Sequence, residues 1–426
     1  MTTNKLDRRN FLKASALVGG GLMLEFNFVS MVSAEELGTL VGSKELNVFV
    51  QIASDGKITI YSATPEMGQG VKTALPMIIA EEMGAKWTDV EVIDAPLDAD
   101  KFGSQGAGGS TSIPENFDTM RKMGASAREM LIGAASETME VDREELEARD
   151  SIVVHSSGES LTFGQLAALA VKQPLPDPEM LSFKDPRSYT IIGTTVGGVD
   201  NLVIATGQSQ FGIDVDIPGM QYASYTRCPR IGGTVIGFNE AEITKLPGIT
   251  QAFILEPDER AGLASMSFLS GLAVLRGGVA IVGEDTWSVM NAKSKLRVRW
   301  NESNASRDDW EQMTLQARQI ADKGDGEVTL EGTNVDKAMA DNNNRTLESF
   351  YQFPYVAHVC MEPMNCTVHF KKGNGSQPDT MELWIPSQFP GQVKEIAENM
   401  LGVKKENVKV NPTRMGGGFG RRAVHD

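Results

Sequence analysis

Cysteine and histidine are scarce in this chain of 426 residues. It contains three cysteines, Cys228, Cys360 and Cys366, and four histidines. Because an iron–sulfur cluster usually takes four thiolates, the chain cannot hold one alone. With so few histidines, a Ser-His-Asp triad has few candidate bases, and the sequence has no G-x-S-x-G elbow and no Walker motif. These absences argue against a serine hydrolase and against a P-loop nucleotidase.

Clustered positive charge and a long uninterrupted apolar run are also missing. The formal net charge is -16, whereas nucleic-acid binding needs a clustered basic surface, so we expect no nucleic-acid partner. The most apolar stretch, residues 14–32, is interrupted by Glu25 and Asn27 and would make a poor spanning helix. A length of 426 residues predicts two or three domains.

Histidine and cysteine come together once, in "AHVCMEPMNCTVH" at residues 357–369. The spacing matches no common zinc finger, and Pro363 interrupts the run, so ordinary residues on strands around a turn are the simpler interpretation. A disulfide between two of the cysteines is a further alternative if the protein is exported. The residues concerned are His358, Cys360, Cys366 and His369, with Cys360–Cys366 as the pair.

The N-terminus has the features of a targeting segment. Arg8 and Arg9 precede Phe11 and Leu12, a weakly apolar, glycine-rich stretch follows, and small residues end it at Ala34. Paired arginines before such a stretch predict a twin-arginine export signal over residues 1–34, and hence a periplasmic protein. A basic N-terminal tail is the alternative interpretation.

Residues 45–173 have the pattern of one mixed α/β unit. The segment 47–63 alternates apolar and polar residues across Asp55-Gly56, which predicts a hairpin. A helix over 73–85, ended by Gly84, and a strand over 89–96 follow. Thr162 and Gln165 have capping-box spacing. A second helix over 117–139 carries Met120, Met123, Ala127, Leu131 and Ala134 on one face.

For the remaining chain, the sequence pattern predicts a linker, a strand-rich unit, a polar stretch and a third unit. The linker spans 174–204, and the unit at 205–300 ends in strand, helix, strand, with Asp285 as N-cap. A polar connection covers 301–346. The third unit, 347–426, has a strand at 381–385, a helix at 390–402 and a strand that runs into glycines. The fold class predicted is α+β, a mixed α/β fold.

Three glycine-rich stretches follow or precede regular elements: "EMGQG" (66–70), "GAGGSTSI" (106–113) and "GGGFGRR" (416–422). For the first two, tight turns next to helices are a sufficient explanation. Consecutive glycines in the third are costly to order, and a ligand held against bare backbone would explain them. Arg421 and Arg422 are candidates for a phosphate contact.

Taken together, these motifs resemble the large, molybdopterin-binding subunit of the xanthine dehydrogenase/aldehyde oxidase family. The resemblance is closest to the exported branch typified by isoquinoline 1-oxidoreductase β subunits and membrane-linked aldehyde dehydrogenases. It covers the chain from about Asn47 onward, and the motifs occur in the order of that branch. They are "EMGQGVKTALPMIIAEEMGA", "GGSTSI", "IPGMQYASYTRCPRIGG", "YQFPYVAHVCMEPMNC", "WIPSQFPG" and "RMGGGFGRR".

The resemblance implies a fold and a set of site residues. Residues 205–300 are expected to form an α/β hammerhead domain, flanked by pieces of the molybdenum-cofactor domains, at 45–173 and from 347 onward. Gln388 matches the glutamine that hydrogen-bonds an oxygen on molybdenum, and Phe419 helps wall the pocket. No protein side chain ligates the metal. The expected cofactor-binding residues are Gln69, Gly70, Gly109, Ser110, Thr111, Ser112, Gly417, Gly418, Phe419, Gly420 and Arg421.

The implied activity is hydroxylation with water, or oxidation of an aldehyde, on a molybdopterin-type molybdenum cofactor expected in its cytosine dinucleotide form. A small aldehyde or an N-heterocycle would be the substrate. Electrons would leave through [2Fe–2S] clusters on a small iron–sulfur subunit, with a c-type cytochrome as a further acceptor. Such a partner would also provide any association with the membrane.

Two departures from the family pattern matter. The family's catalytic glutamate lies far beyond the GGGFG motif, so we expect this chain to be a fragment, or to be completed by a second polypeptide, and to be inactive alone. Ala423 stands where the purine-oxidising branch has glutamate, which argues against a purine substrate. The alternative is a non-catalytic scaffold that keeps the fold and binds no molybdenum.

Overall fold

The computed structural model describes residues 22–25, 48–208, 210–258, 275–324, 326–327, 332, 334–341, 343–374 and 376–425. It divides into two compact units. Among the described residues, the first takes those up to Ile217 and from Cys360 onward, and the second takes those from Pro218 to Val359. Helices and strands are mixed in both, which confirms the predicted class. The predicted export signal lies outside the described residues except for one short strand at 22–25.

A four-stranded sheet begins the first unit, in the order β1 (Leu22–Glu25), β2 (Val48–Ile52), β3 (Ile58–Ser62), β4 (Val90–Asp94). Strands β2 and β3 are antiparallel and form the predicted hairpin, with Gly56 at φ 92° in its turn. Strand β4 runs parallel to β3, because α3 (Val71–Met83) crosses between them. Gly84 caps α3 in the left-handed conformation, as predicted.

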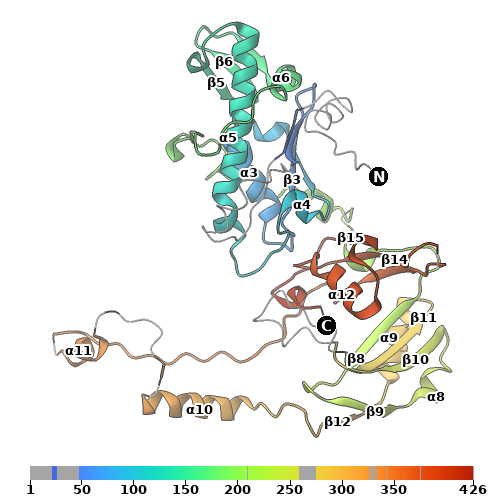
Figure 1. The fold of residues 1–426 in the computed structure, drawn as a ribbon. Helices are drawn as coiled ribbons and strands as arrows, with labels where there is room; N and C mark the ends of the chain where they lie inside the picture. The colour runs from blue at the N-terminus through green and yellow to red at the C-terminus, as the bar shows by residue number, and fades with distance from the viewer. Residues whose placement is uncertain are drawn as a thin grey trace. The chain divides into compact units, whose positions relative to one another are not determined.

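The long helix α5 (Ser112–Met139) packs along α3, as Figure 1 shows. The two backbones approach closely at Gly124, where a Cβ would collide with the carbonyl oxygen of Ile79. All residues predicted for the buried face of α5 are buried (Met120, Met123, Ala127, Leu131 and Ala134). This face, the β2–β3 hairpin and α3 therefore share one hydrophobic core.

Shorter elements complete this part of the first unit. A three-stranded sheet consists of β5 (Leu146–Arg149), β6 (Ile152–His155) and β7 (Ser160–Thr162). The capping box predicted at Thr162 and Gln165 begins α6 (Phe163–Ala170). The other helices are α4 (Ala99–Phe102) and α7 (Asn201–Ala205).

The C-terminal part of the first unit has its own small core. Its sheet has the order β13 (Thr367–Lys371), β14 (Thr380–Ile385), β15 (Val408–Pro412). Strands β14 and β15 are parallel, because α12 (Gln392–Leu401) connects them. Val393 and Ala397 of α12 pack on Leu383 and Val410 of the sheet. The parallel pair directs the end of β14 and the end of β15 to the same edge, where the segments 386–389 and 413–420 begin.

The second unit is built from two antiparallel sheets. One has the order β10 (Ile249–Leu255), β11 (Gly278–Gly283), β8 (Tyr222–Arg227), and the other pairs β12 (Val298–Asn301) with β9 (Thr234–Phe238). The predicted strand, helix, strand over 278–300 is confirmed as β11, α9 (Thr286–Lys295) and β12, and the Asp285 carboxylate caps α9 through the Ser288 N–H. Helix α8 (Glu240–Ile243) precedes β10.

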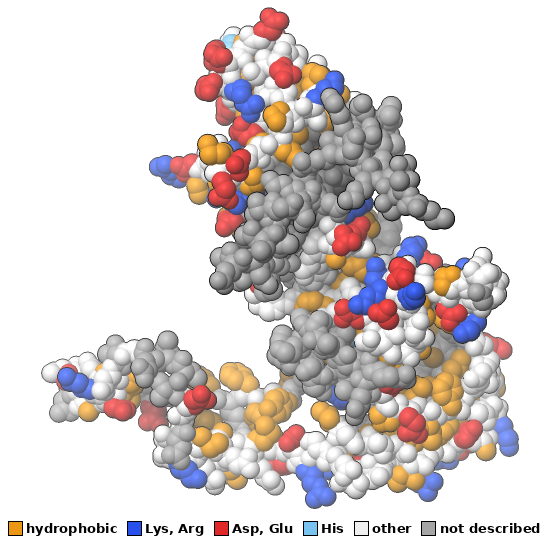
Figure 2. Space-filling model, viewed as in Figure 1, with side chains coloured by type: hydrophobic (Ala, Val, Ile, Leu, Met, Phe, Trp, Pro, Cys, Tyr) orange, Lys and Arg blue, Asp and Glu red, His pale blue; other side chains and the backbone are white. Residues whose placement is uncertain are grey.

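The stretch predicted as a polar connection contains two helices that the sequence did not predict, α10 (Trp310–Lys323) and α11 (Val335–Ala340). The segment 345–359 then contacts α10. Tyr355 stacks edge-on against Trp310 with ring centroids 5.1 Å apart, and Arg318 lies over the Phe350 ring at 4.4 Å. Apolar side chains remain exposed along this segment, and orange groups are visible beside α10 in Figure 2.

On the face in Figure 2, acidic and basic side chains are interspersed. Among the described residues, the helices are too short or too polar for one of them to cross a bilayer.

Candidate functional site

The first glycine-rich turn, at 66–70, is held by its own side chains. The Glu66 carboxylate accepts hydrogen bonds from the N–H groups of Gly68 (2.7 Å), Gly70 (3.1 Å) and Lys72 (2.9 Å). Gln69 accepts from the Met67 N–H through Oε1 and donates to the Pro65 carbonyl through Nε2. These amides at the start of α3 are therefore already satisfied, and the turn's glycines serve the turn itself.

The second glycine-rich stretch leads directly into α5. Gly109 and Ser110 both have φ 60°, and Thr111 is the N-cap residue of the helix that Ser112 begins. The Thr111 hydroxyl and N–H both donate to the Gly108 carbonyl, at 3.3 Å. The preceding residue, Ser110, is exposed. This loop therefore presents small polar side chains at a helix N-terminus.

The third stretch, at 416–420, has an irregular backbone. Gly417, Phe419 and Gly420 have φ of 100°, 53° and 83°. A left-handed conformation costs a phenylalanine roughly 1–2 kcal/mol, so the surrounding structure must impose it. The Phe419 ring is 68% exposed. The N–H groups of Gly417, Gly418 and Phe419 have no hydrogen-bond acceptor within the part of the chain that the structure describes.

These three stretches meet around Gln388, which is 3% exposed. The Gln388 side chain donates from Nε2 to the Ala107 carbonyl (2.8 Å) and accepts at Oε1 from the Gly420 N–H (3.1 Å). Its backbone carbonyl accepts from the Ala107 N–H at 2.9 Å. Gln388 thereby joins the second stretch to the third.

Glycine makes two of these approaches possible. A Cβ at Gly418 would collide with the Met67 sulfur of the first stretch and would lie 2.9 Å from Gln388 Oε1. At Gly106, a Cβ would lie 2.6 Å from the Phe389 ring. Bare backbone therefore lets the segments 66–70, 106–112, 386–389 and 416–420 come together, and we call this group the glycine junction.

The two predicted arginines differ in their burial. Arg422 is 1% exposed, and its guanidinium binds the Glu362 carboxylate (2.9 Å) and backbone carbonyls. The suggestion that Arg422 contacts phosphate is therefore wrong, because its donors are used inside the protein. Arg421 is partly exposed, and its backbone N–H donates to the Gly418 carbonyl.

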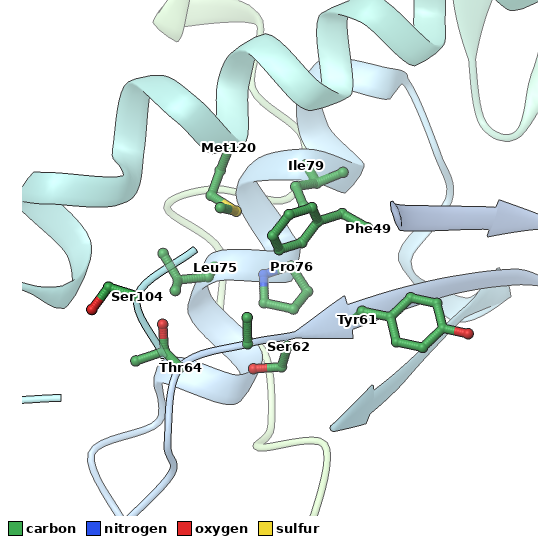
Figure 3. A pocket seen from close by; sticks show the side chains of 10 residues that line it. Phe49, Tyr61, Ser62, Thr64, Leu75, Pro76, Ile79, Ser104 and Met120 are labelled. Carbon is green, nitrogen blue, oxygen red and sulfur yellow. The ribbon is translucent and has the colours of Figure 1, made fainter. Parts of the chain in front are cut away.

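Two cavities adjoin the segment 62–66. A pocket of about 90 Å³ lies against the glycine junction, and Glu66, Asp94, Asp200, Lys72, Arg414 and Ser387 are among its lining residues. Lys72 pairs with Asp94 (2.7 Å) and Asp200 (3.2 Å), and Arg414 also pairs with Asp200. The charged side chains that line this pocket are therefore largely paired with one another. The smaller cavity lies between the hairpin, α3 and Met120 (Figure 3). Its volume of about 10 Å³ leaves room for about one water molecule.

The cysteines and histidines of residues 357–369 do not assemble into a metal site. Within the described ranges, no group of three or more His, Cys, Asp or Glu side chains is placed to share a metal ion. The suggested Cys360–Cys366 disulfide is not formed, and all three cysteines are free thiols. Instead, the Cys360 thiol donates to the Gly418 carbonyl at 3.5 Å, which places it against the glycine junction.

The junction thus brings together some of the predicted site residues. Gln388 contacts Gly418 and Gly420 directly, whereas Gln69 binds within its own turn and Thr111 takes the N-cap position of α5 without a side-chain cap hydrogen bond. Met67, Ala107 and Glu66 also belong to the junction and were not predicted, nor was Glu362, which binds Gly416. Each of these four lies inside or beside a motif quoted above, and the two glutamates are carboxylates next to glycine or proline, the one signal that could have identified them.

Comparison with known proteins identifies the class of domain that carries this junction. Two models, each described as a molybdopterin cofactor-binding domain, match residues 9–201 and 318–426. The junction is built from both matched regions. The chain therefore carries two molybdopterin cofactor-binding domain regions, and residues 202–317 lie between them.

Relatives match over almost the whole chain. The isoquinoline 1-oxidoreductase subunit beta of Brevundimonas diminuta is 27% identical over 99% of this chain and 56% of its own length. The membrane-bound aldehyde dehydrogenase [pyrroloquinoline-quinone] of Gluconacetobacter polyoxogenes is 26% identical over 99% of this chain and 53% of its own length. The chain thus spans about half the length of these curated relatives. It belongs to the xanthine dehydrogenase/aldehyde oxidase family and carries that family's molybdopterin-binding domains.

Among solved structures, quinoline 2-oxidoreductase from Pseudomonas putida 86 is similar at 17% identity. The alignment covers 55% of this chain and 32% of that one, with a TM-score of 0.36.

Proposed function

We propose that the chain is the cofactor-binding part of a molybdenum-dependent oxidoreductase that oxidises an aldehyde or an N-heteroaromatic C–H carbon with water. The observation that carries this proposal is the glycine junction. Segments some 300 residues apart, from both matched domains, meet at bare backbone around one buried glutamine. A large planar cofactor held against backbone requires such a surface.

The residues present fit a ligand rich in hydrogen-bond acceptors. The N–H groups of Gly417, Gly418 and Phe419 are unpaired among the described residues, and successive free amides make a concave site for anions and carbonyl or oxo groups. Gln388 uses one of its two amide hydrogens on Ala107, which leaves the other for a ligand. Ser110 adds an exposed residue at the start of α5, where the helix dipole favours negative charge.

The geometry of these residues supports the roles that we propose for them. Gln388 is held at both ends of its amide, so its remaining N–H is directed before any ligand arrives, and preorganised donors stabilise developing negative charge without reorganisation. Phe419, exposed and fixed in a left-handed conformation, offers a flat apolar wall for a substrate ring. When bound, the cofactor supplies a two-electron oxidation in which oxygen from water enters the substrate.

Substrate and partners are proposed from the names of the relatives and from the cysteine count. The printed names of the relatives refer to isoquinoline and to an aldehyde, and one relative is called a subunit. We propose an aldehyde or an N-heterocycle as substrate, the cytosine dinucleotide form of the cofactor, and a small [2Fe–2S] subunit as electron acceptor, with a c-type cytochrome beyond it. Three cysteines in the chain are too few for such clusters, which supports a separate subunit.

Export to the periplasm through the twin-arginine signal at Arg8 and Arg9 is part of the same proposal. Replacing both arginines by lysine should keep the protein in the cytoplasm, as cell fractionation would show. Periplasmic recovery of that variant would contradict the proposal.

Metal content tests the main proposal. The chain would be produced together with the continuing reading frame, if one exists, and the iron–sulfur subunit, and molybdenum per folded chain would be measured. We expect about one molybdenum per chain in the wild type, a large loss in Gln388→Leu, and no change in Gln377→Leu, an exposed glutamine. A folded wild type without molybdenum would instead support the non-catalytic scaffold.

A further inference from the structure

A buried ion pair lies directly behind the glycine junction. The side chains of Arg422 and Glu362 are 0% and 5% exposed, and Arg422 Nη2 lies 2.9 Å from Glu362 Oε2. Burying two charges is costly unless their geometry is good and their other hydrogen-bonding groups are satisfied. The other contacts of this pair therefore indicate what it holds in place.

Arg422 distributes its donors over several backbone carbonyls. Nε donates to Gly417 (2.8 Å), Nη1 to Pro386 (3.2 Å) and Nη2 to Glu362 (2.7 Å). Gly417 belongs to the third glycine-rich stretch, and Pro386 lies two residues before Gln388. One planar guanidinium thus links the two segments that carry the free amides and the buried glutamine.

Glu362 holds the same stretch from the other side. Its Oε2 accepts from the Gly416 N–H (2.8 Å), and its own N–H donates to the Gly416 carbonyl (3.2 Å). Its Oε1 accepts from the Ile213 N–H (3.0 Å) and from Asn365 Nδ2 (2.9 Å). Gly416 lies so close to Glu362 that a Cβ added at position 416 would collide with the Glu362 side chain.

We propose that Glu362 and Arg422 are positioning residues, which fasten Gly416 and Gly417 so that the unpaired N–H groups of Gly417, Gly418 and Phe419 form a preformed cradle for a ligand. Neither side chain reaches the ligand, because their polar atoms are used on Gly416, Gly417, Pro386 and each other. This inference rests on the proposed function for the identity of the ligand, but not for the order of the cradle. The geometry requires arginine, because lysine keeps the charge and loses the planar fork.

Hydrogen–deuterium exchange of the cofactor-free chain tests the order of the cradle. The hydrogen-bonded amides of Gly416, Gly420, Arg421 and Ala423 report on residues 415–423. In Arg422→Lys we expect these amides to exchange about tenfold faster, since exchange follows local opening, while α5 keeps its wild-type rate. Wild-type exchange at 415–423, or an equal rise in α5, would overturn the proposal.

A second buried pair in the same unit provides the matched control. Arg128 donates to the Glu82 carboxylate and carbonyl, and also to the Ser182 carbonyl, and none of these residues belongs to the junction segments. Arg128→Lys should lower the unfolding midpoint as Arg422→Lys does, and should leave exchange at 415–423 unchanged. Faster exchange there in Arg128→Lys would show that general destabilisation explains the effect.

The double variant Glu362→Gln/Arg422→Met separates positioning from stability. Removing both charges avoids an unpaired buried charge, so its unfolding midpoint should exceed that of Arg422→Met alone. Its exchange at 415–423 should nevertheless stay fast, because the neutral side chains no longer bind Gly417 and Pro386. A double variant with wild-type exchange would refute a positioning role.

Molybdenum content gives the third readout. If the wild type holds molybdenum, Arg422→Lys should lose most of it at an equal folded fraction, whereas Arg128→Lys should keep it. Equal molybdenum in both variants would refute the inference. If the wild type holds none, the proposed function fails, and the exchange experiment alone still decides whether Glu362 and Arg422 order the cradle.

Discussion

Adding a single methyl group at Gly418 is the most direct test of the glycine junction. The Cβ of Gly418→Ala would collide with the Met67 sulfur and lie 2.9 Å from Gln388 Oε1. Gly418 is not among the glycines with positive φ, so alanine imposes no backbone strain of its own. The effect of the substitution therefore reports on the contact between the segments 66–70, 386–389 and 416–420.

The expected cost is that of overpacking a closed contact, about 1–3 kcal/mol in the free energy of unfolding. Met67 can move part of the way, since its side chain is flexible, but Gln388 is fixed by hydrogen bonds to Ala107 and Gly420. Gly197→Ala is the matched control, because a Cβ there meets no atom within 4 Å and the glycine has no positive φ. That control should be neutral or stabilising by about 0.4–1 kcal/mol.

Urea unfolding of the purified chain, followed by tryptophan fluorescence, would measure both variants. We expect a lower midpoint in Gly418→Ala, and partial recovery in Met67→Ala/Gly418→Ala, because the shorter side chain at 67 makes room for the methyl group. If Gly418→Ala unfolds at the wild-type midpoint and the double variant shows no coupling, the first and third glycine-rich stretches are not in contact, and the reasoning about the junction is refuted.

Three further predictions concern the first unit. Gly124→Ala should cost about 1–3 kcal/mol, because its Cβ meets the backbone oxygen of Ile79, which cannot turn aside; a wild-type urea midpoint would contradict this. Thr162→Ala should cost about 1 kcal/mol through loss of the capping box, whereas Thr162→Ser should recover most of it in the same assay. Burial would raise the pKa of Glu81, but the N–H groups of Ile191 and Ile192 and the Lys184 ammonium hold that pKa below its ordinary value of 4.5. The stabilisation by Glu81 is therefore complete above pH 4.5 and lost as pH falls through the lowered value, so Glu81→Gln should flatten stability against pH there; an unchanged acid profile would contradict this.

Local structure in this chain was predictable wherever the signal lay within a few residues. The hairpin turn at Asp55-Gly56, the cap at Gly84, the capping box at Thr162 and the N-cap at Asp285 all occur where the sequence predicted them. In each case neighbouring side chains or glycine conformations decide the outcome. The helix α10 was missed because its sequence is polar on average and none of its residues is buried, although Met313, Ala317 and Ile320 recur at helical spacing.

Contacts between distant segments were only partly predictable. The motif order suggested that the glycine-rich stretches converge, and Gln388 does join the second to the third. The sequence gives no indication that Glu66 would occupy the amides of the first turn, or that Arg422 would be buried on Glu362 rather than exposed to a ligand. Both outcomes depend on which carboxylate the fold brings within reach, and that is a tertiary property. The domain boundaries at 174–204 and 205–300, and the cofactor roles of the site residues, stay predictions.

The bond between Ala107 and Gln388 joins positions 281 apart in the chain. During synthesis, the ribosome must therefore release most of the polypeptide before the junction can close. A nascent chain that stops between Ala107 and Gln388 would contain only the first half of the junction. If the proposed cofactor binds at the junction, an unfinished chain could not bind it, because half of the site would be missing.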